Sequence, residues 1–505
     1  MENEKLPRHL TVTSAALLNL GTNIGAGIFL VQGIMIRDLG SPGLVIVMFL
    51  FGGLISLFGT WSYVEMGVRR PVSGGPKEYL DVAFPKPKSV VPFIFSMVWI
   101  FAVMPGQAAA VCIGCGKYFM AAIYGSQENA AATGATFVAN NYDYIIRFIG
   151  SVALIIITAT HAFLPKVGVK VQDGLGIVKT LVLVLACVMG LIASLGLIKS
   201  APSTNLFKNF FVGSVFDPAK IINNFFKVLF VYDGWATINY SLDELIEPER
   251  SLPKAAFGAF GACIVLYMGC TFSYFAVVPV SNLMSETAGE IGVQYFAKVL
   301  GPVFGGTVIP IMISSAAFSC VMCICFASSR LIFECARDGY FPPAVNTLLG
   351  RKSGFDTPCN SLIFFASLSL LYMNAPPPGD AYGLLVDMSG YPQWIFYGLS
   401  IFGLIVMNFR DPDPNPKFKS PLLGQIFFVL FCIAMAIMPF VPPSGPAGKL
   451  PYWLVPTFGT LLIILCSGWG YYHCTKTDVL ANSFNSKQRE IENLESMGDD
   501  KKLEK

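Results

Sequence analysis

Long apolar segments separated by short polar stretches dominate the chain. A transmembrane helix needs roughly 20 predominantly apolar residues, and about twelve segments approach or exceed that length. They run near Thr11–Ile36, Gly43–Val68, Val90–Phe119, Tyr144–Leu164, Val167–Leu195, Ile221–Ile246, Ala255–Val280, Pro302–Ile332, Thr357–Met373, Gly383–Asn408, Leu422–Val441 and Trp453–His473. This pattern predicts an all-α polytopic membrane protein with about twelve transmembrane helices.

The composition agrees with this prediction. Of the 505 residues, 54% are hydrophobic and 13% are charged, and the mean hydropathy is +0.62. Soluble domains carry about 25% charged residues. The net charge of +3 indicates no polyanionic partner, which argues against nucleic acid binding.

Lysine and arginine concentrate in the even-numbered connections and at both ends of the chain. The positive-inside rule converts this asymmetry into an orientation with both termini in the cytosol. The polar stretch Met1–His9 leads into a segment that is too long for a signal-peptide core, and no small-residue cleavage site follows. We therefore expect a retained cytosolic N-terminus.

Two apolar segments are interrupted where a membrane helix should be most regular. The first segment contains Gly21-Thr22-Asn23-Ile24-Gly25-Ala26-Gly27-Ile28-Phe29, and the sixth contains Phe230-Val231-Tyr232-Asp233-Gly234-Trp235. Glycine weakens a helix by about 1 kcal/mol relative to alanine. A broken backbone in lipid must line a cavity, because unsatisfied N–H and C=O groups are costly there. The acid Asp233 at membrane depth marks a functional site by default, and two such breaks indicate the substrate site of a secondary transporter.

The first break offers two kinds of free backbone group. The N–H groups where the helix resumes near Gly27 attract anions, and the C=O groups of the preceding half attract cations. One break can therefore hold a zwitterion. Two alternatives stay open at this point: each single glycine could serve helix packing, and Phe230 could be a core aromatic residue rather than a lid over the site.

Other classes of function find little support. His9, His161 and His473 stand apart, so no metal site is expected, and no cofactor motif appears. An intramembrane enzyme would need a paired carboxylate or a Ser/His arrangement, and a channel would need a repeated polar ring. None of the 13 cysteines falls in an external loop, so no external disulfide is expected.

Several motifs resemble those of the amino acid, polyamine and organocation superfamily. Residues 21–29 resemble its first helix, and Trp61–Gly67 with Ser73-Gly74-Gly75 resembles its second helix and first internal loop. The sixth-helix stretch with the residues after it is similar to the L-type amino acid transporter (light-subunit) branch, and the end of the eighth segment matches that branch too. The residues that carry this similarity are Phe230–Trp235, Asn239-Tyr240, Asp243-Glu244, Pro248–Pro253, Ser328–Leu331 and Ala336–Gly339.

This resemblance implies a LeuT-type fold. Residues 1–10 would be cytosolic, and 11–408 would form a ten-helix core of two inverted repeats, about 11–195 and 221–408, with broken helices 1 and 6. Helices 11 and 12 would follow in 409–475, and 476–505 would be a cytosolic tail. The implied function is sodium-independent transport or exchange of amino acids by alternating access, with the plasma membrane as the expected location. A cationic amino acid or polyamine carrier is the alternative.

The family pattern implies where the substrate binds. Its carboxylate would meet the N–H groups of Ala26 and Gly27, and its amine would meet carbonyls near Asn23, Phe230 and Asp233. Phe230 would be the gating aromatic residue. The full expected set is Asn23, Ile24, Gly25, Ala26, Gly27, Phe230, Val231, Asp233, Gly234 and Trp235, with Gln393 and Trp394 of the tenth helix shaping the side-chain pocket.

Lys179 is an isolated cation in the fifth segment. An unpaired charge in the membrane is costly unless it has a role, although a snorkelling lysine is an alternative. In related sodium-independent carriers a fifth-helix lysine stands where LeuT-type symporters bind sodium, and Lys179 matches that position. The resemblance implies that its ammonium holds the two broken helices together.

Charged residues at cytosolic helix ends are candidates for an internal gate. They are Glu65, Glu244, Arg250, Arg330 and Arg337. For each of them singly, a solvated charge at the membrane interface is the alternative.

Three departures from the branch bear on partners and substrate. The stretch 118–141 has no cysteine to link a single-span glycoprotein heavy chain, so such a partner is expected only without a disulfide. Asp233 stands where many carriers of large neutral amino acids have glycine and where members accepting dibasic amino acids have aspartate. Ala26 replaces a common serine. We expect mainly neutral, large apolar or aromatic substrates, with dibasic amino acids as an open alternative.

Overall fold

The computed structural model describes residues 10–476 except 26, 88, 199, 201–203, 205, 285–289, 354, 356, 378, 380, 413–415 and 443–450. This described part is helical, and one parallel bridge between Leu10 and Leu245 is its only β-structure. The helical elements that make up the membrane segments are α1 (Val12–Asn23), α2 (Gly27–Leu39), α3 (Pro42–Arg69), α5 (Val90–Val98), η1 (Trp99–Val103), α6 (Met104–Tyr124), α9 (Tyr142–Phe163), α10 (Pro165–Ser194), α11 (Pro218–Val231), η3 (Thr237–Glu244), α12 (Pro248–Val277), η5 (Phe304–Val308), α14 (Ile309–Arg337), α16 (Cys359–Asn374), α17 (Ala381–Arg410), α18 (Leu422–Ile437), η6 (Met438–Phe440) and α19 (Leu454–Lys476). The shorter connecting helices are α4 (Pro76–Ala83), α7 (Gln127–Ala132), α8 (Thr136–Asn140), η2 (Leu206–Asn209), η4 (Val280–Leu283), α13 (Ile291–Leu300) and α15 (Pro343–Leu349).

The helices account for the predicted membrane segments. Ten helical stretches of the described part are long and apolar enough to cross a membrane, and the first of them combines α1 and α2. The 16-residue α16 and the broken pair of α11 and η3 supply the other two of the predicted twelve. The prediction of an all-α polytopic membrane protein is confirmed.

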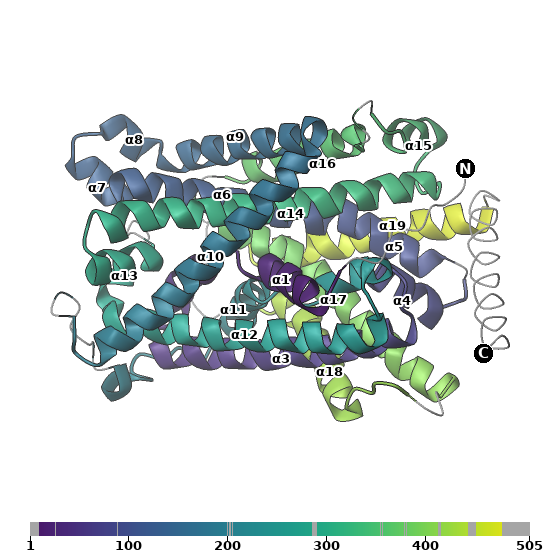
Figure 1. Cartoon of the computed structure of the whole chain (residues 1–505), viewed down its shortest axis with the longest axis horizontal. Coiled ribbons are helices and arrows are strands. Elements are labelled where there is room, and N and C mark those ends of the chain that lie inside the picture. The colour runs from purple at the N-terminus through teal and green to yellow at the C-terminus, as the bar shows by residue number, and fades with distance from the viewer. Residues whose placement is uncertain are drawn as a thin grey trace.

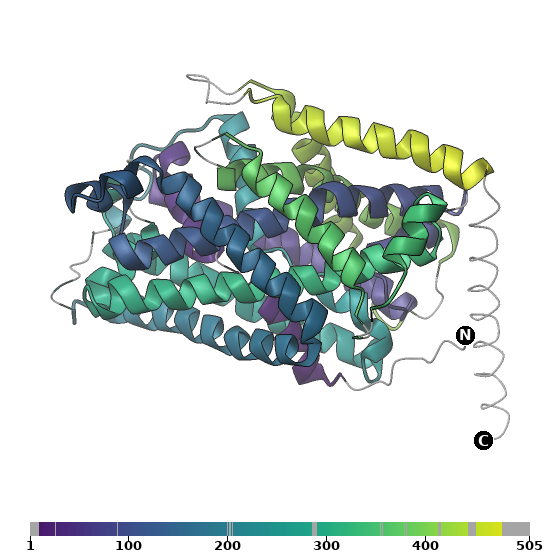
Figure 2. The same ribbon diagram turned by 90° about the horizontal axis from the view of Figure 1, so that it is seen from above.

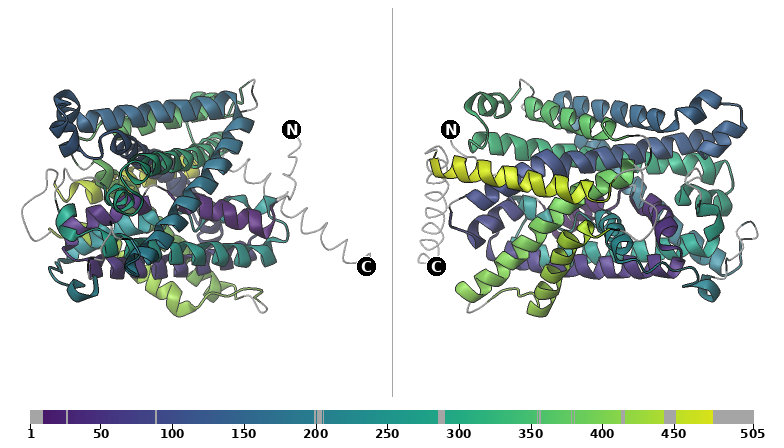
Figure 3. Two further views of the ribbon diagram at one scale, coloured as in Figure 1. Left: turned by 60° about the vertical axis from the view of Figure 1, so that its left-hand side comes forward. Right: turned by 180° about the vertical axis from the view of Figure 1, so that it is seen from behind.

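Several long helices, among them α3, α12 and α14, lie roughly horizontal in Figure 1, and α10 crosses them diagonally. The connecting helices α4 and α15 lie at one end of the bundle, and α7, α8 and α13 lie at the other. The short helix α1 lies in the middle and packs against α10 and α12. The last helix, α19, runs along an outer edge of the bundle in Figure 2 and packs on α5 and α17. The right-hand view of Figure 3 shows α19 crossing the face that is hidden in Figure 1.

Local sequence explains where several helices begin and bend. The Ser41 side chain accepts a hydrogen bond from the Leu44 N–H at 3.3 Å, and the Asp217 side chain caps α11 in the same way. The π-helical turns η1 and η5 lie directly before Pro105 and Pro310. Proline lacks an N–H and clashes with the carbonyl four residues earlier, so a wider turn accommodates it within a continuous span.

Candidate functional site

The first break separates α1 from α2. The helix α1 ends at Asn23, Ile24 is extended with φ −76° and ψ 96°, and α2 begins at Gly27. The interruption predicted for the first helix is therefore present. Ala26 lies outside the described residues, so the predicted contact of its N–H with a substrate carboxylate stays a prediction.

The second break lies directly beside the first. The helix α11 ends at Val231, and η3 begins at Thr237. Between them Gly234 has a φ of +120°, a conformation that favours glycine, and a Cβ atom there would lie 2.6 Å from the Asn23 Oδ1. The Thr22 hydroxyl also donates to the Thr237 hydroxyl at 3.2 Å. Glycine at 234 therefore permits the two breaks to touch.

Four neutral donors hold the carboxylate of Asp233. The Gln107 amide of α6 donates to its Oδ2 at 2.7 Å, and the Gln393 amide of α17 donates at 2.8 Å. Its Oδ1 accepts from the Tyr397 hydroxyl at 3.2 Å and from the Gly234 N–H at 3.0 Å. Hydrogen bonds to an ionised group are stronger than neutral ones and offset the cost of burying the carboxylate. This carboxylate cage joins α6, α17 and the second break.

Asn23 presents a second polar side chain at the junction of the breaks. The residue is only 3% exposed, and neither amide atom has a hydrogen-bond partner in the described part of the chain. Its backbone carbonyl accepts from the Tyr267 hydroxyl at 2.7 Å. Because buried amides are normally hydrogen-bonded, the Asn23 side chain is available to a polar ligand.

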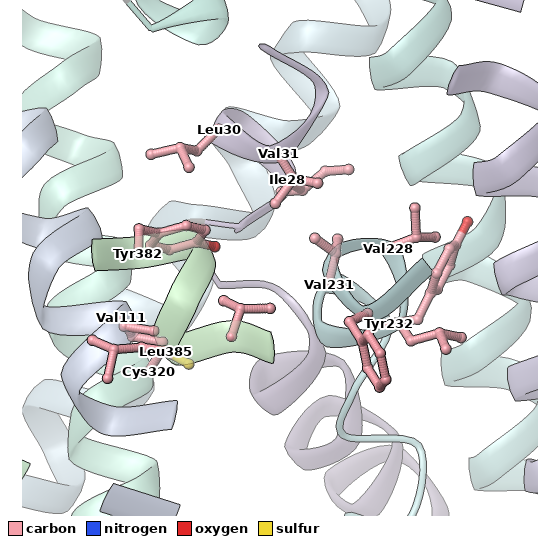
Figure 4. Close-up of a cluster of buried hydrophobic side chains, with 14 of the residues drawn as sticks. Ile28, Leu30, Val31, Val111, Val228, Val231, Tyr232, Cys320, Tyr382 and Leu385 are labelled. Atoms are coloured by element: carbon pink, nitrogen blue, oxygen red, sulfur yellow. The ribbon is translucent and has the colours of Figure 1, made fainter. Parts of the chain in front are cut away.

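Glycines let apolar side chains approach the first break closely. A Cβ atom at Gly25 would lie 3.5 Å from the Cys320 Sγ, and one at Gly27 would lie 3.0 Å from the Val231 Cγ2 and 3.4 Å from the Tyr382 hydroxyl. Side chains from α14, α11 and α17 therefore border the unwound backbone. Figure 4 shows them within one apolar cluster that contains Ile28, Leu30, Val31, Val111, Val228, Val231, Tyr232, Cys320, Tyr382 and Leu385.

Aromatic rings surround the second break. Phe230 lies edge-on to Tyr382, with 6.2 Å between ring centroids. Trp235 is buried between Tyr63 and Tyr397, each 4.8 Å away. These contacts fix the position of both predicted aromatic residues on either side of Asp233.

Trp394 contacts a different helix from Gln393, the residue with which it was predicted to shape the side-chain pocket. It packs against Phe428 of α18 at 5.6 Å and against Phe431 at 6.2 Å. Its neighbour Gln393 faces the carboxylate cage instead. The tenth membrane helix therefore directs Gln393 towards the breaks and Trp394 towards the outer helix α18.

Sequence comparison identifies the family of the chain. The family described as "Amino acid permease" matches residues 10–465. The chain belongs to the amino acid permease family. This permease therefore has the superfamily membership that its motifs predict.

Named relatives of the permease are similar over most of their length. The mouse b(0,+)-type amino acid transporter 1 is 26% identical over 453 residues, which cover 90% of this chain and 86% of the relative. The high-affinity methionine permease of Saccharomyces cerevisiae is 27% identical over 495 residues, covering 94% and 82%. The human cystine/glutamate transporter is 26% identical over 440 residues, covering 86% and 81%. These relatives are transporters, which supports a transport role for the permease rather than an enzymatic one.

Lys179 reaches the first broken helix of the permease. The residue is 1% exposed, and its ammonium donates a hydrogen bond to the Gly21 carbonyl in the last turn of α1. Carbonyl groups at the C-terminal end of a helix carry partial negative charge and favour a cation. Lys179 therefore ties α10 to the end of α1, directly before the break.

The predicted gate residues of the permease fall in separate places. Glu65 is buried, and its carboxylate accepts from the Ser420 N–H at 2.8 Å, from the Ser420 hydroxyl at 2.6 Å and from the Asn408 amide at 3.0 Å. Arg250 is exposed and pairs with Glu247 at 3.7 Å. Glu65 thus belongs to a buried network that ties α3 to α17 and to the segment before α18, apart from Arg250.

Two other predicted gate residues, Arg330 and Glu244, interact electrostatically with one another. The Arg330 guanidinium lies over the Phe326 ring, donates to the Phe326 carbonyl at 3.0 Å and interacts electrostatically with Glu244. Arg337 pairs with Glu334 of its own helix at 3.6 Å. Glu244 of η3 is therefore the predicted gate residue with which Arg330 of α14 interacts electrostatically.

The prediction from sequence missed several residues of the site. Gln107 is a lone amide in the third apolar segment, and polar residues within membrane helices usually face the bundle interior, so this signal was available. Tyr397 follows Gln393 by four residues and therefore shares its helix face. Nothing in the sequence distinguishes Tyr382 or Cys320 from ordinary core residues.

Proposed function

We propose that this permease is a sodium-independent exchanger of neutral L-amino acids with large apolar or aromatic side chains, working by alternating access. One observation carries the proposal. The unpartnered amide of Asn23 and the carboxylate cage of Asp233 lie at the two breaks, next to the apolar cluster of Figure 4. This combination offers polar groups for the charged ends of an amino acid and apolar surface for its side chain.

The two ends of the substrate would bind to opposite kinds of group. The ammonium would meet the Asp233 side and the C-terminal end of α1, where carbonyl groups are concentrated. The carboxylate would meet the start of α2 near Gly27, where N–H groups are free. The apolar side chains of Val111, Val231 and Leu385 would contact the substrate side chain. The name of the yeast methionine permease supports this choice, because methionine is neutral and apolar.

Dibasic amino acids are the second candidate, and Asp233 is the observation that favours them. The hydrogen-bond donors to its carboxylate in the described structure are two amides, a phenol and a backbone N–H, none of which is charged. A cationic substrate side chain would supply the opposite charge. In that case Asp233 would bind the cationic side chain of the substrate instead of its α-ammonium group.

Lys179 supports independence from sodium. Its ammonium bonds a carbonyl at the end of the first broken helix, a position suited to a cation. The permease would thus carry its own positive charge where a coupled ion would otherwise be needed.

The proposal extends to membrane location and partners. We infer a plasma membrane protein with both termini in the cytosol. All 13 cysteines lie within long helices and are free thiols, so a heavy-chain partner would associate without a disulfide. A reducible complex of higher mass on non-reducing gels of native membranes would contradict this inference.

Uptake into proteoliposomes tests the function. The measurement is initial uptake of radiolabelled methionine, with unlabelled methionine inside and with sodium or choline outside. We expect uptake that requires internal amino acid and is unchanged in choline. Strict dependence on sodium would refute sodium independence, and undiminished uptake into empty vesicles would refute exchange.

Competition separates the two substrate classes. Leucine, phenylalanine, arginine and lysine are tested on wild type and on Asp233→Gly. Competition by the neutral pair alone supports the main proposal. A selective loss of arginine and lysine in the variant, by roughly tenfold to over a hundredfold, would favour the dibasic candidate, because a hydrogen bond to a charged group contributes about 1.5–3 kcal/mol.

A further inference from the structure

The helices α1 and η3, one from each broken span, are joined at both ends. A hydrogen bond between two threonine hydroxyls joins the end of α1 to the start of η3. At the other end, the N–H of Leu10, two residues before α1, donates to the Glu244 carbonyl at 2.9 Å. The Ile246 N–H donates to the Leu10 carbonyl at 3.0 Å, which completes the parallel bridge between Leu10 and Leu245. The two helices are therefore tied to each other at two separate places.

The bridge between Leu10 and Leu245 lies against an apolar cluster. Leu245 is fully buried and belongs to a cluster with Ala15 of α1, Ile238 and Leu242 of η3 and residues of α3 and α12. Breaking a backbone hydrogen bond in such surroundings leaves polar groups unsatisfied away from water, which is costly. The bridge should therefore stay intact when α1 or η3 moves.

The loop between α3 and α4 contacts η3 through a reciprocal pair of hydrogen bonds. The Asp243 N–H donates to the Ser73 hydroxyl at 2.9 Å, and the Ser73 N–H donates to the Asp243 carboxylate at 3.2 Å. Gly75 of the same loop has a φ of +56°, and a Cβ atom there would lie 3.2 Å from the Tyr240 ring. Glycine at this position permits the loop to lie directly on η3.

The other side of this loop is attached to different helices. The short helix α4, which follows the loop, packs against α5 and α17. The Lys77 ammonium of α4 lies 2.7 Å from the Asp338 carboxylate at the end of α14. Figure 1 shows α4 at the end of the bundle opposite α7, α8 and α13. The loop therefore links the joined pair of α1 and η3 to α14 and α17.

The contacts between this loop region and η3 differ in exposure. Asp243 is exposed and Ser73 is half-buried, so water can replace their two hydrogen bonds at little cost. Four residues earlier in η3, the Asn239 amide oxygen accepts from the Tyr79 hydroxyl at 2.8 Å, and both residues are only 2% exposed. The end of η3 can therefore leave Ser73 while Asn239 keeps its buried contact.

We propose that Ser73 and Asp243 form a releasable latch on the cytosolic side of the permease, and that α1 and η3 swing away from it as one unit about Asn239. This inference rests on the proposed function, because alternating access requires the substrate site to open to the cytosol. The cytosolic position of the latch follows from the orientation that the lysine and arginine asymmetry predicts. Release of the latch frees the cytosolic ends of both broken spans together.

Two engineered disulfides test the latch and the joined movement separately. Ser73→Cys/Asp243→Cys locks the latch, and Leu10→Cys/Leu245→Cys locks the bridge, since residues in direct backbone contact are within reach of a disulfide. Exchange of radiolabelled methionine in proteoliposomes is measured before oxidation, after oxidation and after reduction, and peptide mass spectrometry confirms each disulfide. We expect the oxidised latch pair to lose exchange and to regain it on reduction. The oxidised bridge pair should keep exchanging.

The outcomes distinguish the latch from the proposed function. Absence of exchange by untreated wild type would contradict the proposed function. Undiminished exchange by the latch pair with its disulfide fully formed would overturn the latch. Loss of exchange on oxidation of the bridge pair, with wild type unaffected by the same treatment, would overturn the movement of α1 and η3 as one unit.

A single substitution tests the latch without a disulfide. Ser73→Ala removes the acceptor of the Asp243 N–H. Because a weaker latch depletes the state that is closed to the cytosol, the KM for external methionine should rise about twofold to tenfold. Ser353→Ala is the matched control, since it removes a loop hydroxyl 2.9 Å from the Thr357 hydroxyl at the same predicted side of the membrane. A wild-type KM in Ser73→Ala, or an equal rise in Ser353→Ala, would overturn the latch.

Discussion

The Lys227 ammonium lies 3.9 Å from the Asp387 carboxylate, and this ion pair joins α11 to α17. The two side chains are 6% and 20% exposed. Lys227 lies one helical turn before Phe230. It is on the side of the second break that faces the end of the bundle with α7, α8 and α13 (Figure 1). The pair therefore braces the helix that carries Phe230, the predicted gating residue, against the helix that carries Gln393.

Replacing one partner of this pair should destabilise the permease more than replacing both. Lys227→Met leaves the Asp387 charge without its lysine, at a cost of about 3 kcal/mol for a largely buried pair. Lys227→Met/Asp387→Asn should recover part of that loss. Thermal unfolding of the purified protein measures these two variants and the single variant Asp387→Asn. Strictly additive losses from the two single changes would show that the residues are not coupled.

Gln107→Leu should weaken transport by removing one donor from the Asp233 carboxylate. The bond is 2.7 Å long and reaches a charged acceptor, so its loss should cost about 1.5–3 kcal/mol, or roughly tenfold to over a hundredfold. Gln32→Leu is the matched control, because the Gln32 amide is buried but bonds the neutral Thr271 hydroxyl. Radiolabelled uptake compares the two variants. Equal loss of uptake in both would argue against a special role of the Asp233 cage.

Lys179→Met should slow turnover sharply while leaving the permease folded. The change removes the only positive charge at the Gly21 carbonyl in the described structure and so loosens the end of α1 from α10. Lys254→Met removes an exposed lysine from α12 and should transport normally. Initial exchange rates in proteoliposomes test the pair of variants. Wild-type exchange by Lys179→Met would contradict the proposed replacement of a coupled ion.

Lys77→Met should destabilise the end of the bundle where α4 meets α14. The Lys77 ammonium lies 2.7 Å from Asp338 and 5.2 Å from the centre of the Tyr340 ring. Burial by itself lowers the pKa of Lys77. Tyr340 and Asp338 together raise this pKa by more than burial lowers it, so the pKa lies above its usual value. A lysine whose pKa is higher in the folded than in the unfolded protein stabilises the fold. This stabilisation is complete at pH values below the pKa of the unfolded state, and it is lost as the pH rises through the pKa of the folded state.

The pH dependence of that destabilisation is a separate check. The difference in unfolding temperature between wild type and Lys77→Met should be the same at about pH 6 and about pH 9, since both lie below the lysine pKa. A difference that shrinks markedly by about pH 9 would show that Lys77 titrates earlier and that the ion pair is weaker than its geometry indicates.

Much of the candidate site could be predicted because it depends on local properties of the chain. Glycines interrupt a helix wherever they cluster, so Gly25, Gly27 and Gly234 revealed the two breaks. A charge within an apolar segment is costly in any fold, so Asp233 and Lys179 were recognisable without knowledge of their neighbours. The number of spans and the all-helical fold followed in the same way from segment length.

Contacts between distant segments could not be predicted in this way. Gln107 and Asp233 are 126 positions apart, and Glu65 meets Ser420 across 355 positions. Helical periodicity predicts which residues share a face of one helix, but it does not predict how that helix is rotated relative to its neighbours.

The sequence by itself therefore determined that this protein crosses the membrane, where its helices break and which buried charges need partners. Only the tertiary structure decided what those partners are. Asp233 is held by two amides and a phenol, Lys179 by a backbone carbonyl, and Glu65 by a network apart from Arg250. The physical reason is that the free-energy cost of burying a charge depends on the residue and on the apolar segment around it, both of which the sequence contains. The hydrogen bonds that offset this cost depend on how separate helices pack against one another.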